Sequence, residues 1–319
     1  MLALLFPGQG SQEVGMGREA YYASAAARAV FDAADQALGF SLSQICFEGP
    51  EEELLRTEVQ QPAILTTGIA LLRALQERAE VTPSYVAGHS LGEYTALVAT
   101  GAIGLEDAVR LVNARGRFMQ EAVPEGRGAM AAVLGLSPGE VQLACSEAAA
   151  ATGRIVTPAN YNSPQQTVIA GDPVAIEVAC SRARQEGAKR TIPLAVSAPF
   201  HCGLMAPAAE KLALELARVH FRESSVPVVT NVEAAPNHDA TRVAALLEAQ
   251  VTAPVRFVDM VEKLVELGVT RVLEVGTGRV LSGLVARTAR KLQRACLSTM
   301  GDIADAVSFV SLAPGVDPS

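Results

Sequence analysis

The sequence predicts an α/β protein in which helices cover both faces of a mostly parallel sheet and a smaller unit is inserted into the chain. Short apolar runs typical of buried strands alternate with amphipathic helical stretches over most of the 319 residues, as they do in parallel sheets. Between residues 126 and 196 the order changes to strand–helix–strand–strand–helix–strand. With 50% hydrophobic and 19% charged residues, the chain has ample material for a core.

Charge and cysteine content exclude several classes of function. A net charge of −8 argues against nucleic acid as a partner, because phosphate binding requires a basic surface. The five cysteines are odd in number and scattered, which predicts unpaired thiols in a reducing compartment and no metal site. Met1–Phe6 lacks the basic segment of a signal peptide, and no apolar run is long enough to span a membrane. We therefore expect a cytoplasmic protein.

The first element is the apolar run Leu2–Phe6, which predicts a buried strand followed by the loop P-G-Q-G-S-Q at residues 7–12. This loop fails the dinucleotide-binding pattern G-x-G-x-x-G, because Glu13 occupies the place of the third glycine. Helices are expected over residues 18–38 and 62–78. The second begins with proline, whose missing N–H costs nothing in a first turn.

The chain is organised around the pentapeptide Gly88-His89-Ser90-Leu91-Gly92, which lies between an extended segment and a helix expected over residues 93–99. G-x-S-x-G in this context is typical of a nucleophile elbow. Both outer positions are glycine because side chains there would collide in so tight a turn. At a helix N-terminus, free N–H groups stabilise the oxyanion formed when serine attacks an acyl carbonyl. We therefore predict Ser90 as a nucleophile on an α/β-hydrolase-like unit; the alternative is a turn with an incidental serine.

Arg115 lies on a helix expected over residues 105–122. At about 100° per residue it falls in the middle of the apolar face, whereas Arg110 and Arg117 point to the other side. A guanidinium in that position either extends to solvent or has a buried anionic partner. That partner is either a carboxylate of the protein or the carboxylate of a ligand, which a guanidinium grips in bidentate fashion.

Residues 126–196 follow the βαββαβ order of the ferredoxin-like pattern. Strands are expected over 128–136, 154–159, 166–170 and 189–196, with helices over 138–150 and 173–186. We expect this small ferredoxin-like subdomain to be inserted into a large catalytic subdomain made of residues 1–125 and 197–319. Its second and third strands would be joined by the polar turn N-Y-N-S-P at residues 160–164.

His201 ends the junction S-A-P-F-H, just before a helix expected over residues 204–219. Loops between a strand and a helix often display functional side chains. A serine nucleophile needs a base, and His201 is the best-placed candidate. The other three histidines, His89, His220 and His238, are interpreted as structural or exposed.

The C-terminal part alternates again, with strands over 226–232 and 271–275 and helices over 243–251 and 257–267. V-L-E-V-G-T-G at residues 272–278 resembles the first motif of S-adenosylmethionine-dependent methyltransferases. However, Val280 replaces the third glycine, and too little chain follows for the rest of such a fold. A helix over 280–292 would present a basic face, either solvated or suited to an acidic partner, formed by Arg287, Arg290, Lys291 and Arg294.

Together, G-Q-G-S-Q, G-H-S-L-G, A-R-G, N-Y-N-S-P and P-F-H form one constellation along the chain. In these motifs and their order it resembles, over essentially its whole length, the family of malonyl-CoA:acyl-carrier-protein transacylases and polyketide synthase acyltransferase domains. The resemblance implies transfer of malonyl from malonyl-CoA to the phosphopantetheine thiol of acyl carrier protein, through a malonyl-serine ester. It also implies no bound cofactor or metal and a transient, acidic carrier-protein partner; we expect a monomer.

The resemblance also implies roles for single residues. Ser90 would be the nucleophile and His201 its base, oriented by a backbone carbonyl near Gln250 in place of a carboxylate. Arg115 would bind the free carboxylate of the malonyl group. The oxyanion hole would be formed by the backbone N–H groups of Gln9 and Leu91.

Three further positions are matched to substrate binding. Asn160 and Asn162 match a polar loop near the family's site. Phe200, just before His201, resembles the A-F-H pattern of malonyl-selective polyketide acyltransferases, whereas many fatty-acid enzymes carry serine there. The pathway, fatty-acid or polyketide synthesis, therefore stays open at this point.

Two other classes compete with the transferase. In a serine hydrolase of the α/β-hydrolase type the acid precedes a histidine near the C-terminus, but here a long stretch follows His201 and no acid stands out as its partner. A non-enzymatic carrier-protein-binding module would have to explain an intact nucleophile, base and buried arginine without chemistry.

Overall fold

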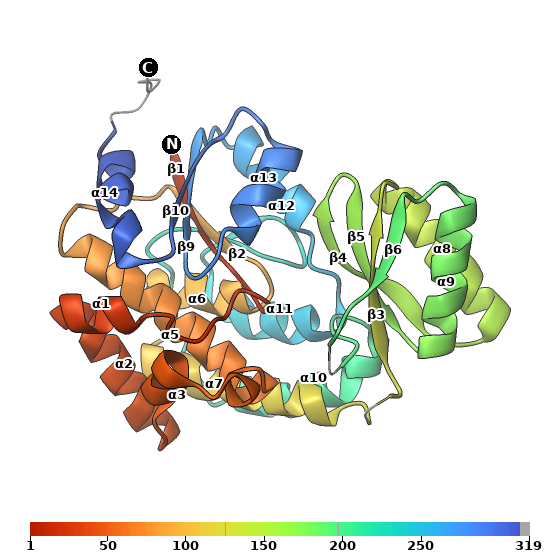
Figure 1. Ribbon diagram of the computed structural model, residues 1–319, viewed down its shortest axis with the longest axis horizontal. Coiled ribbons are helices and arrows are strands. Elements are labelled where there is room, and N and C mark those ends of the chain that lie inside the picture. Colours follow the sequence, from red (N-terminus) through yellow and green to blue (C-terminus); the bar gives the residue numbers. More distant parts are fainter. Residues whose placement is uncertain (125, 197, 313–319) are drawn as a thin grey trace.

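The computed structural model describes residues 1–124, 126–196 and 198–312. Within these residues a six-stranded sheet has the order β10-β9-β1-β2-β7-β8 (Figure 1). Its strands are β1 (Leu2–Phe6), β2 (Tyr85–Gly88), β7 (Val228–Val229), β8 (Pro236–Asn237), β9 (Arg271–Val275) and β10 (Gln293–Leu297). Neighbouring strands are parallel except for β7 and β8, which are antiparallel. The prediction of a mostly parallel sheet is confirmed.

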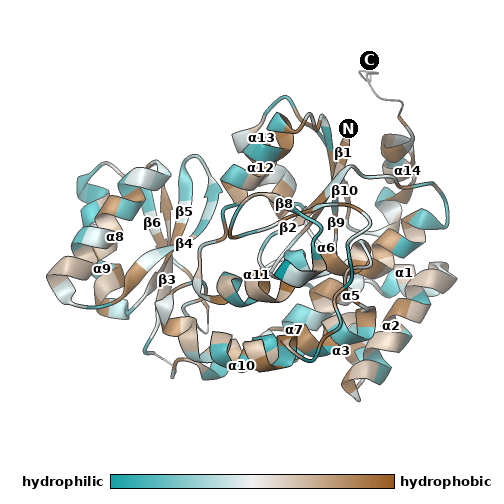
Figure 2. Ribbon diagram, turned by 180° about the vertical axis from the view of Figure 1, so that it is seen from behind, coloured by the Kyte–Doolittle hydropathy of each residue, from teal (hydrophilic) through white to brown (hydrophobic). Residues whose placement is uncertain are grey.

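Helices pack on both faces of this sheet. Over the whole described chain they are α1 (Arg18–Ala23), α2 (Ala25–Leu38), α3 (Leu42–Glu48), α4 (Glu51–Leu54), α5 (Thr57–Gln76), α6 (Leu91–Ala99), α7 (Leu105–Glu121), α8 (Pro138–Thr152), α9 (Pro173–Gln185), α10 (Ala206–Leu216), α11 (Ala240–Thr252), α12 (Phe257–Glu266), α13 (Val280–Thr288) and α14 (Ile303–Ser311). In Figure 2 peripheral helices such as α2 and α10 carry both hydrophilic and hydrophobic colours, as expected of helices with one face in a core.

Strand β1 shows why the central strands are apolar throughout. Leu2, Leu4 and Phe6 belong to one core cluster, which includes side chains of α2, α5 and α6. Ala3 and Leu5 belong to a second cluster, with side chains of α12 and α13. Because successive side chains of a strand point to opposite faces, a strand covered on both sides must be hydrophobic at every position.

A second sheet lies at one side of the molecule (Figure 1). Within the described chain it has four strands in the order β4-β5-β3-β6. They are β3 (Ala129–Leu134), β4 (Val156–Ser163), β5 (Gln166–Gly171) and β6 (Arg190–Pro193), and all their pairings are antiparallel. Helices α8 and α9 share a separate core cluster with these strands. The predicted order of elements between residues 126 and 196 is confirmed.

Both helices expected before residue 80 differ from the structure. The single helix expected over residues 18–38 is broken at Ser24, whose extended backbone and side chain cap α2 by accepting a hydrogen bond from Ala27 N. Helix α5 begins at Thr57, so Pro62 lies inside the helix and not in its first turn. The carbonyl of Glu58, which Pro62 cannot bond, accepts a hydrogen bond from Asn113 Nδ2 at 2.7 Å instead.

Two polar segments also differ from expectation. Residues 160–163 of N-Y-N-S-P lie in β4 and not in a turn, so the turn before β5 is shorter than expected. The expected helix over 280–292 ends at Thr288, and Arg294 lies in β10. The basic residues predicted to share one helix face therefore do not do so; of them, Arg287 alone lies on α13.

The described residues contain no helix that is long and apolar enough to cross a membrane. All five cysteines are free, as predicted from their number and spacing.

Candidate active site

The G-x-S-x-G stretch forms a sharp turn between β2 and α6. Ser90 has φ 52° and ψ −105°, a backbone conformation that residues other than glycine rarely adopt. A methyl group on Gly88 would lie 2.0 Å from the backbone of Gly92, and one on Gly92 would lie 2.0 Å from the carbonyl oxygen of Phe6. Both glycines are therefore required by close backbone approach, which holds the serine out of the turn.

Ser90 and His201, which are far apart in the chain, meet at this turn. Nε2 of His201 lies 2.7 Å from Oγ of Ser90, and Nδ1 lies 2.8 Å from the backbone carbonyl oxygen of Gln250. Because a carbonyl only accepts, the proton belongs on Nδ1, and Nε2 can accept from the hydroxyl. Burial, with the nearby charge of Arg115, lowers the pKa of His201 to about 3. The imidazole is therefore neutral near pH 7 and able to take a proton.

Arg115 is only 2% exposed and reaches the same hydroxyl from α7. Its Nη2 donates to Ser90 Oγ at 3.1 Å and to Gln250 Oε1 at 2.9 Å, and its Nη1 donates to Gln61 Oε1 at 2.8 Å. No acidic side chain in the described chain forms an ion pair with it. Its buried Nε has no hydrogen-bond partner among the described residues. Of the two alternatives for this guanidinium, the protein salt bridge is not formed.

A cavity of about 550 Å³ connects these groups. Ser90, Arg115 and His201 line it, together with Phe200 and the loop at residues 7–12, which includes Gln9. Asn160 and Asn162 of β4 line it from the second sheet, and Leu281 and Leu284 of α13 form part of a further wall. Leu91 is not among the lining residues, but it begins α6, where backbone N–H groups have no partner within the helix.

The cavity lies where parallel strands end. The loop after β1 and the turn after β2 meet so closely that a methyl group on Gly8 would lie 2.3 Å from the carbonyl oxygen of His89. This contact places Gln9 beside the nucleophile turn. In α/β sheets, ligands bind in the crevice at the carboxyl ends of strands, where the chain order switches direction, as it does on either side of β1 here.

The second sheet is joined to the first beside the nucleophile. Nε2 of His89 lies 2.8 Å from Oδ1 of Asn162. Backbone hydrogen bonds at 2.9 Å run from Tyr161 N to Val255 O and from Val255 N to Ala159 O. His89, interpreted from the sequence as structural or exposed, is half-buried and connects the elbow to β4.

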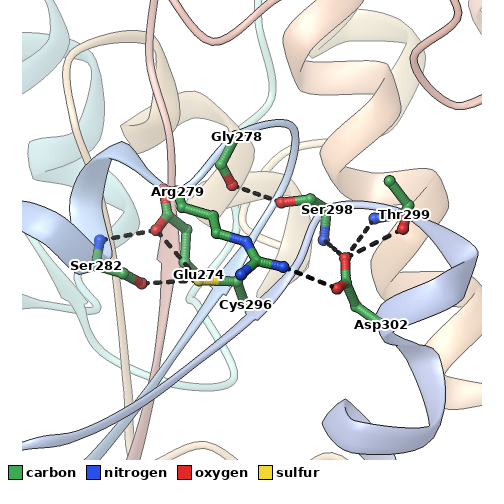
Figure 3. Close-up of polar contacts among 8 residues, drawn as sticks. All are labelled: Glu274, Gly278, Arg279, Ser282, Cys296, Ser298, Thr299 and Asp302. Atoms are coloured by element: carbon green, nitrogen blue, oxygen red, sulfur yellow. Dashed lines mark hydrogen bonds and ion pairs between the residues drawn. The ribbon is translucent and has the colours of Figure 1, made fainter.

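The V-L-E-V-G-T-G segment leads into α13, and Figure 3 shows the polar contacts around it. Glu274, at the end of β9, accepts hydrogen bonds from the backbone N–H groups of Leu281 at 3.0 Å and Ser282 at 2.7 Å. Nearby, Asp302 forms an ion pair with Arg279 at 3.2 Å. Burial raises the pKa of Glu274. Glu274 therefore caps α13 with a buried carboxylate. This structural role accounts for the acidic residue of the segment without a bound ligand.

Sequence reasoning missed three polar residues of this site: Gln61, Glu93 and Asn231. Asn231 bridges the two sides of the nucleophile, since its Nδ2 donates to Gly88 O and its Oδ1 accepts from Ser90 N, both at 2.6 Å. Glu93 lies in the first turn of α6 and is 2% exposed. The available signal was a polar residue inside an otherwise apolar run, which is costly unless it is paired.

A strained serine that is hydrogen-bonded to a neutral, buried imidazole at the carboxyl ends of a parallel sheet is the arrangement typical of serine-dependent enzymes on α/β folds. The sequence motifs described above indicate which family of such proteins this chain resembles. The chain belongs to the acyl transferase domain family, whose model matches residues 3–315.

Individual relatives are similar over nearly their whole length. The malonyl CoA-acyl carrier protein transacylase of Escherichia coli strain K12 is 46% identical over 307 residues, which cover 96% of this chain and 99% of that protein. The structure of the malonyl CoA-acyl carrier protein transacylase from Coxiella burnetii matches with a TM-score of 0.94 at 40% identity, covering 98% of both chains. A malonyl-transacylase solved in complex with a type II polyketide synthase acyl-carrier protein matches with a TM-score of 0.93 at 44% identity, covering 96% of this chain and 99% of that one.

Proposed function

We propose that this protein transfers the malonyl group of malonyl-CoA to the thiol of acyl carrier protein and so supplies fatty-acid synthesis. The observation that carries the proposal is the position of Arg115. A buried guanidinium with no acidic ion-pair partner in the described chain donates to the hydroxyl of Ser90 at 3.1 Å, and so would recognise an acyl group with a free carboxylate. Full-length similarity to transacylases of that activity supports the same conclusion.

The reaction proceeds in two half-reactions. His201 takes the hydroxyl proton as Ser90 Oγ attacks the thioester carbonyl, and the C–S bond then breaks. Coenzyme A leaves with that proton as the free thiol, and a malonyl-serine ester remains. In the second half-reaction His201 deprotonates the phosphopantetheine thiol of the carrier protein, whose sulfur attacks the ester and restores the serine hydroxyl.

The tetrahedral intermediates require an oxyanion hole. The backbone N–H of Leu91 at the start of α6 and that of Gln9 in the cavity-lining loop are proposed as its donors. One such donor stabilises the transition state by about 3 kcal/mol.

Gln250 replaces the acid of a conventional triad. Its backbone carbonyl, 2.8 Å from Nδ1 of His201, fixes the tautomer and can stabilise the imidazolium that forms in the transition state. A carbonyl carries no charge, so the imidazole is less basic than one paired with a carboxylate.

Phe200, Asn160 and Asn162 are proposed as substrate-binding residues because all three line the cavity. Phe200 is 7% exposed, and its ring fills space that a methyl branch on the acyl group would need. Asn162 is already bonded to His89, so its contribution to substrate binding would be indirect.

The architecture suits this chemistry. We propose an α/β-hydrolase-like catalytic subdomain of residues 1–125 and 197–319 and an inserted ferredoxin-like subdomain of residues 126–196. The separate core cluster of the second sheet supports this division. The cavity has lining residues from both parts, and a cleft between them would keep water from the malonyl ester, which otherwise would be hydrolysed.

Carrier-protein binding is proposed on the side of α13. Arg287, Arg290, Lys291 and Arg294 follow one another there, although they do not share a helix face. An acidic carrier protein would be attracted by such a cluster on a chain that is otherwise negative. The match to a transacylase solved with its carrier protein supports a partner of this kind.

The test is intact-protein mass spectrometry after mixing the enzyme with malonyl-CoA or acetyl-CoA, without acceptor. We expect a malonyl adduct that is absent in Ser90→Ala and is discharged by holo acyl carrier protein. Steady release of free malonate without an adduct would instead assign the protein to the serine hydrolases.

A second candidate differs only in pathway: a free-standing malonyl transferase that serves a polyketide synthase. The similarity to a type II polyketide synthase transacylase and the phenylalanine at position 200 favour it. Rates of discharge to fatty-acid and polyketide carrier proteins, measured side by side on the same malonyl-enzyme, decide between the two pathways.

A further inference from the structure

Glu93 is a buried carboxylate one helical turn beyond the nucleophile, and it does not line the cavity. Its Oε2 accepts hydrogen bonds from Gln250 Nε2 at 2.7 Å and from the backbone N–H of Asn231 at 3.1 Å. Neither partner belongs to α6: Gln250 lies on α11, and Asn231 follows β7. Glu93 therefore ties the nucleophile's helix to two other segments of the site.

The contact with Gln250 determines which way that amide points. Oε1 of Gln250 accepts from Arg115 Nη2 at 2.9 Å, while Nε2 donates to Glu93. An ionised carboxylate only accepts and a guanidinium only donates, so the reversed amide would lose both hydrogen bonds. The backbone of the same residue meets Nδ1 of His201 at 2.8 Å. Gln250 Nε2 also donates to the backbone carbonyl of Ser90 at 3.0 Å. Glu93 therefore acts together with Arg115 and Ser90 to orient the residue that contacts both the imidazole and the guanidinium.

Burial lowers the pKa of Arg115, and the negative charge of Glu93 is among the effects that oppose this lowering. A buried guanidinium is costly without an anion close by, and the hydrogen bonds of Arg115 go to neutral groups. Glu93 stands on the other side of the Gln250 amide. Burial raises its pKa to about 7, while Gln250, Asn231 and the charge of Arg115 oppose that rise. Neighbouring Tyr94, whose pKa burial raises to about 12, stays neutral.

We propose that Glu93 is a positioning residue for acyl transfer, which orients Gln250 and serves as the counter-charge that a substrate carboxylate replaces at Arg115. The proposal rests on the proposed function, because it requires a malonyl carboxylate at that guanidinium. A second anion there favours the protonated form of Glu93. Acylation itself exchanges a hydroxyl proton for a thiol proton and releases none. Loading Ser90 with malonyl therefore takes up part of a proton near pH 7, whereas loading with acetyl takes up none.

The experiment follows single-turnover acylation of Ser90 by intact mass and proton uptake with a pH indicator in weak buffer, both near pH 7. Wild type is compared with Glu93→Gln and Glu93→Ala. Glu274→Gln is the matched control. Glu274 is also a buried carboxylate that accepts two hydrogen bonds, but both donors are backbone N–H groups of the helix that it caps. Malonyl-CoA and acetyl-CoA are used in parallel.

Glu93→Gln places an amide oxygen where both donors can still be satisfied, so we expect acetyl loading within a few-fold of wild type and no proton uptake with malonyl. Glu93→Ala removes the shorter of the two hydrogen bonds donated by Gln250 Nε2 and leaves the one to Ser90 O. We expect loading by both substrates to fall by up to about 100-fold, the cost of a modest misplacement of reacting groups. The control should keep the rates and the proton uptake of wild type.

Normal loading of folded Glu93→Ala by both substrates would overturn the positioning role. Equal proton uptake by wild type and Glu93→Gln, or none in wild type, would overturn the counter-charge role. If Glu93→Ala does not fold, the comparison of wild type with Glu93→Gln decides alone. A failure of the proposed function looks different: it would be the absence of any malonyl adduct, or unimpaired malonyl loading of Arg115→Ala.

Discussion

Two strand–turn–helix junctions of the same sheet, β2 to α6 and β9 to α13, use similar residues for different purposes. Each has a glycine-containing turn and a buried glutamate whose pKa is raised by burial. The carboxylate of Glu274 is occupied by backbone N–H groups of its own helix. Glu93 reaches groups on other segments, beside a buried guanidinium. Glu274 thus caps its helix, because its hydrogen-bond donors lie in that helix. Glu93 instead connects parts of the candidate active site, because its donors lie on other segments.

The glycines of the two turns also differ. Gly88 is required because any side chain would meet the backbone of Gly92 at 2.0 Å. Gly278 has φ 82°, and a methyl group added there would make an ordinary contact with Ser11 Cβ at 3.8 Å. Gly88 is restricted by backbone packing and Gly278 by its backbone conformation, so substitutions at these two positions should differ in their effect.

The largest effect is expected at the nucleophile junction, from Arg115→Ala. Truncating one partner of a buried ion pair costs about 2–5 kcal/mol, so malonyl loading should fall by a factor of about 30 to several thousand. Acetyl loading should survive, because acetyl has no carboxylate to bind. The measurement is the rate of Ser90 acylation with each thioester; equal loss of both would mean that the arginine acts structurally.

Gly88→Ala should cost about 3 kcal/mol or more, since a backbone–backbone collision cannot be relieved by moving a side chain. Gly278→Ala should cost only about 1 kcal/mol, the strain of a left-handed conformation. Urea denaturation of the two variants tests the difference. Similar losses would show that the two turns tolerate side chains equally and would remove the packing argument for the elbow.

The two buried carboxylates should give stability a pH dependence of the same sign. A raised folded-state pKa means that the folded protein binds the proton more tightly, so stability falls as pH rises from the unfolded value towards the folded one. For Glu93 this window runs from about 4.5 to about 7. Over it, wild type should lose roughly 3 kcal/mol relative to Glu93→Gln. The measurement is denaturant unfolding of both proteins at several pH values. A difference in unfolding free energy that stayed constant with pH would contradict the prediction.

Glu274→Ala should destabilise the protein by about 1–3 kcal/mol, because two backbone N–H groups of α13 lose their acceptor. Acylation of Ser90 should remain close to wild type at temperatures where the variant is folded. Thermal unfolding and single-turnover loading are measured on the same preparation. A large loss of loading without a loss of stability would assign Glu274 to the site and remove the contrast with Glu93.

The smallest effect is expected on the surface of α13. Arg287 donates to Gln166 Oε1 at 3.0 Å and is otherwise free to attract an acidic carrier protein. Arg287→Glu should raise the KM for the carrier protein by a few-fold, as expected for one exposed charge, and leave loading from malonyl-CoA unchanged. Arg218→Glu, a charge reversal after α10, is the control. If both variants behave alike, the docking side is wrongly assigned.

Local patterns in the sequence correctly predicted those strands, helix faces and turns that the spacing of apolar and glycine residues is enough to specify. The apolar runs gave β1 and β9, the spacing on α7 placed Arg115 in the core, and G-x-S-x-G placed Ser90 in a strained turn. Local patterns predicted the wrong helix boundary where a residue distant in the chain forms the hydrogen bond that a backbone group needs. Asn113 bonds the carbonyl that Pro62 leaves free, so α5 extends past the proline towards its N-terminus, which no local signal indicates.

By itself the sequence determined the mostly parallel sheet, the order of elements between residues 126 and 196, the strained serine and a guanidinium on an apolar face, because each follows from the spacing of neighbouring residues. The sequence predicted His201 as the base for Ser90, and the resemblance implied a carbonyl near Gln250 as its partner; the structure places both within hydrogen-bond distance. Only the tertiary structure decided that Gln250 also meets Arg115 and that Glu93 contacts Gln250. These contacts join segments far apart in the chain. The direction of a hydrogen bond between such segments depends on how packed elements face one another, which periodicity does not encode.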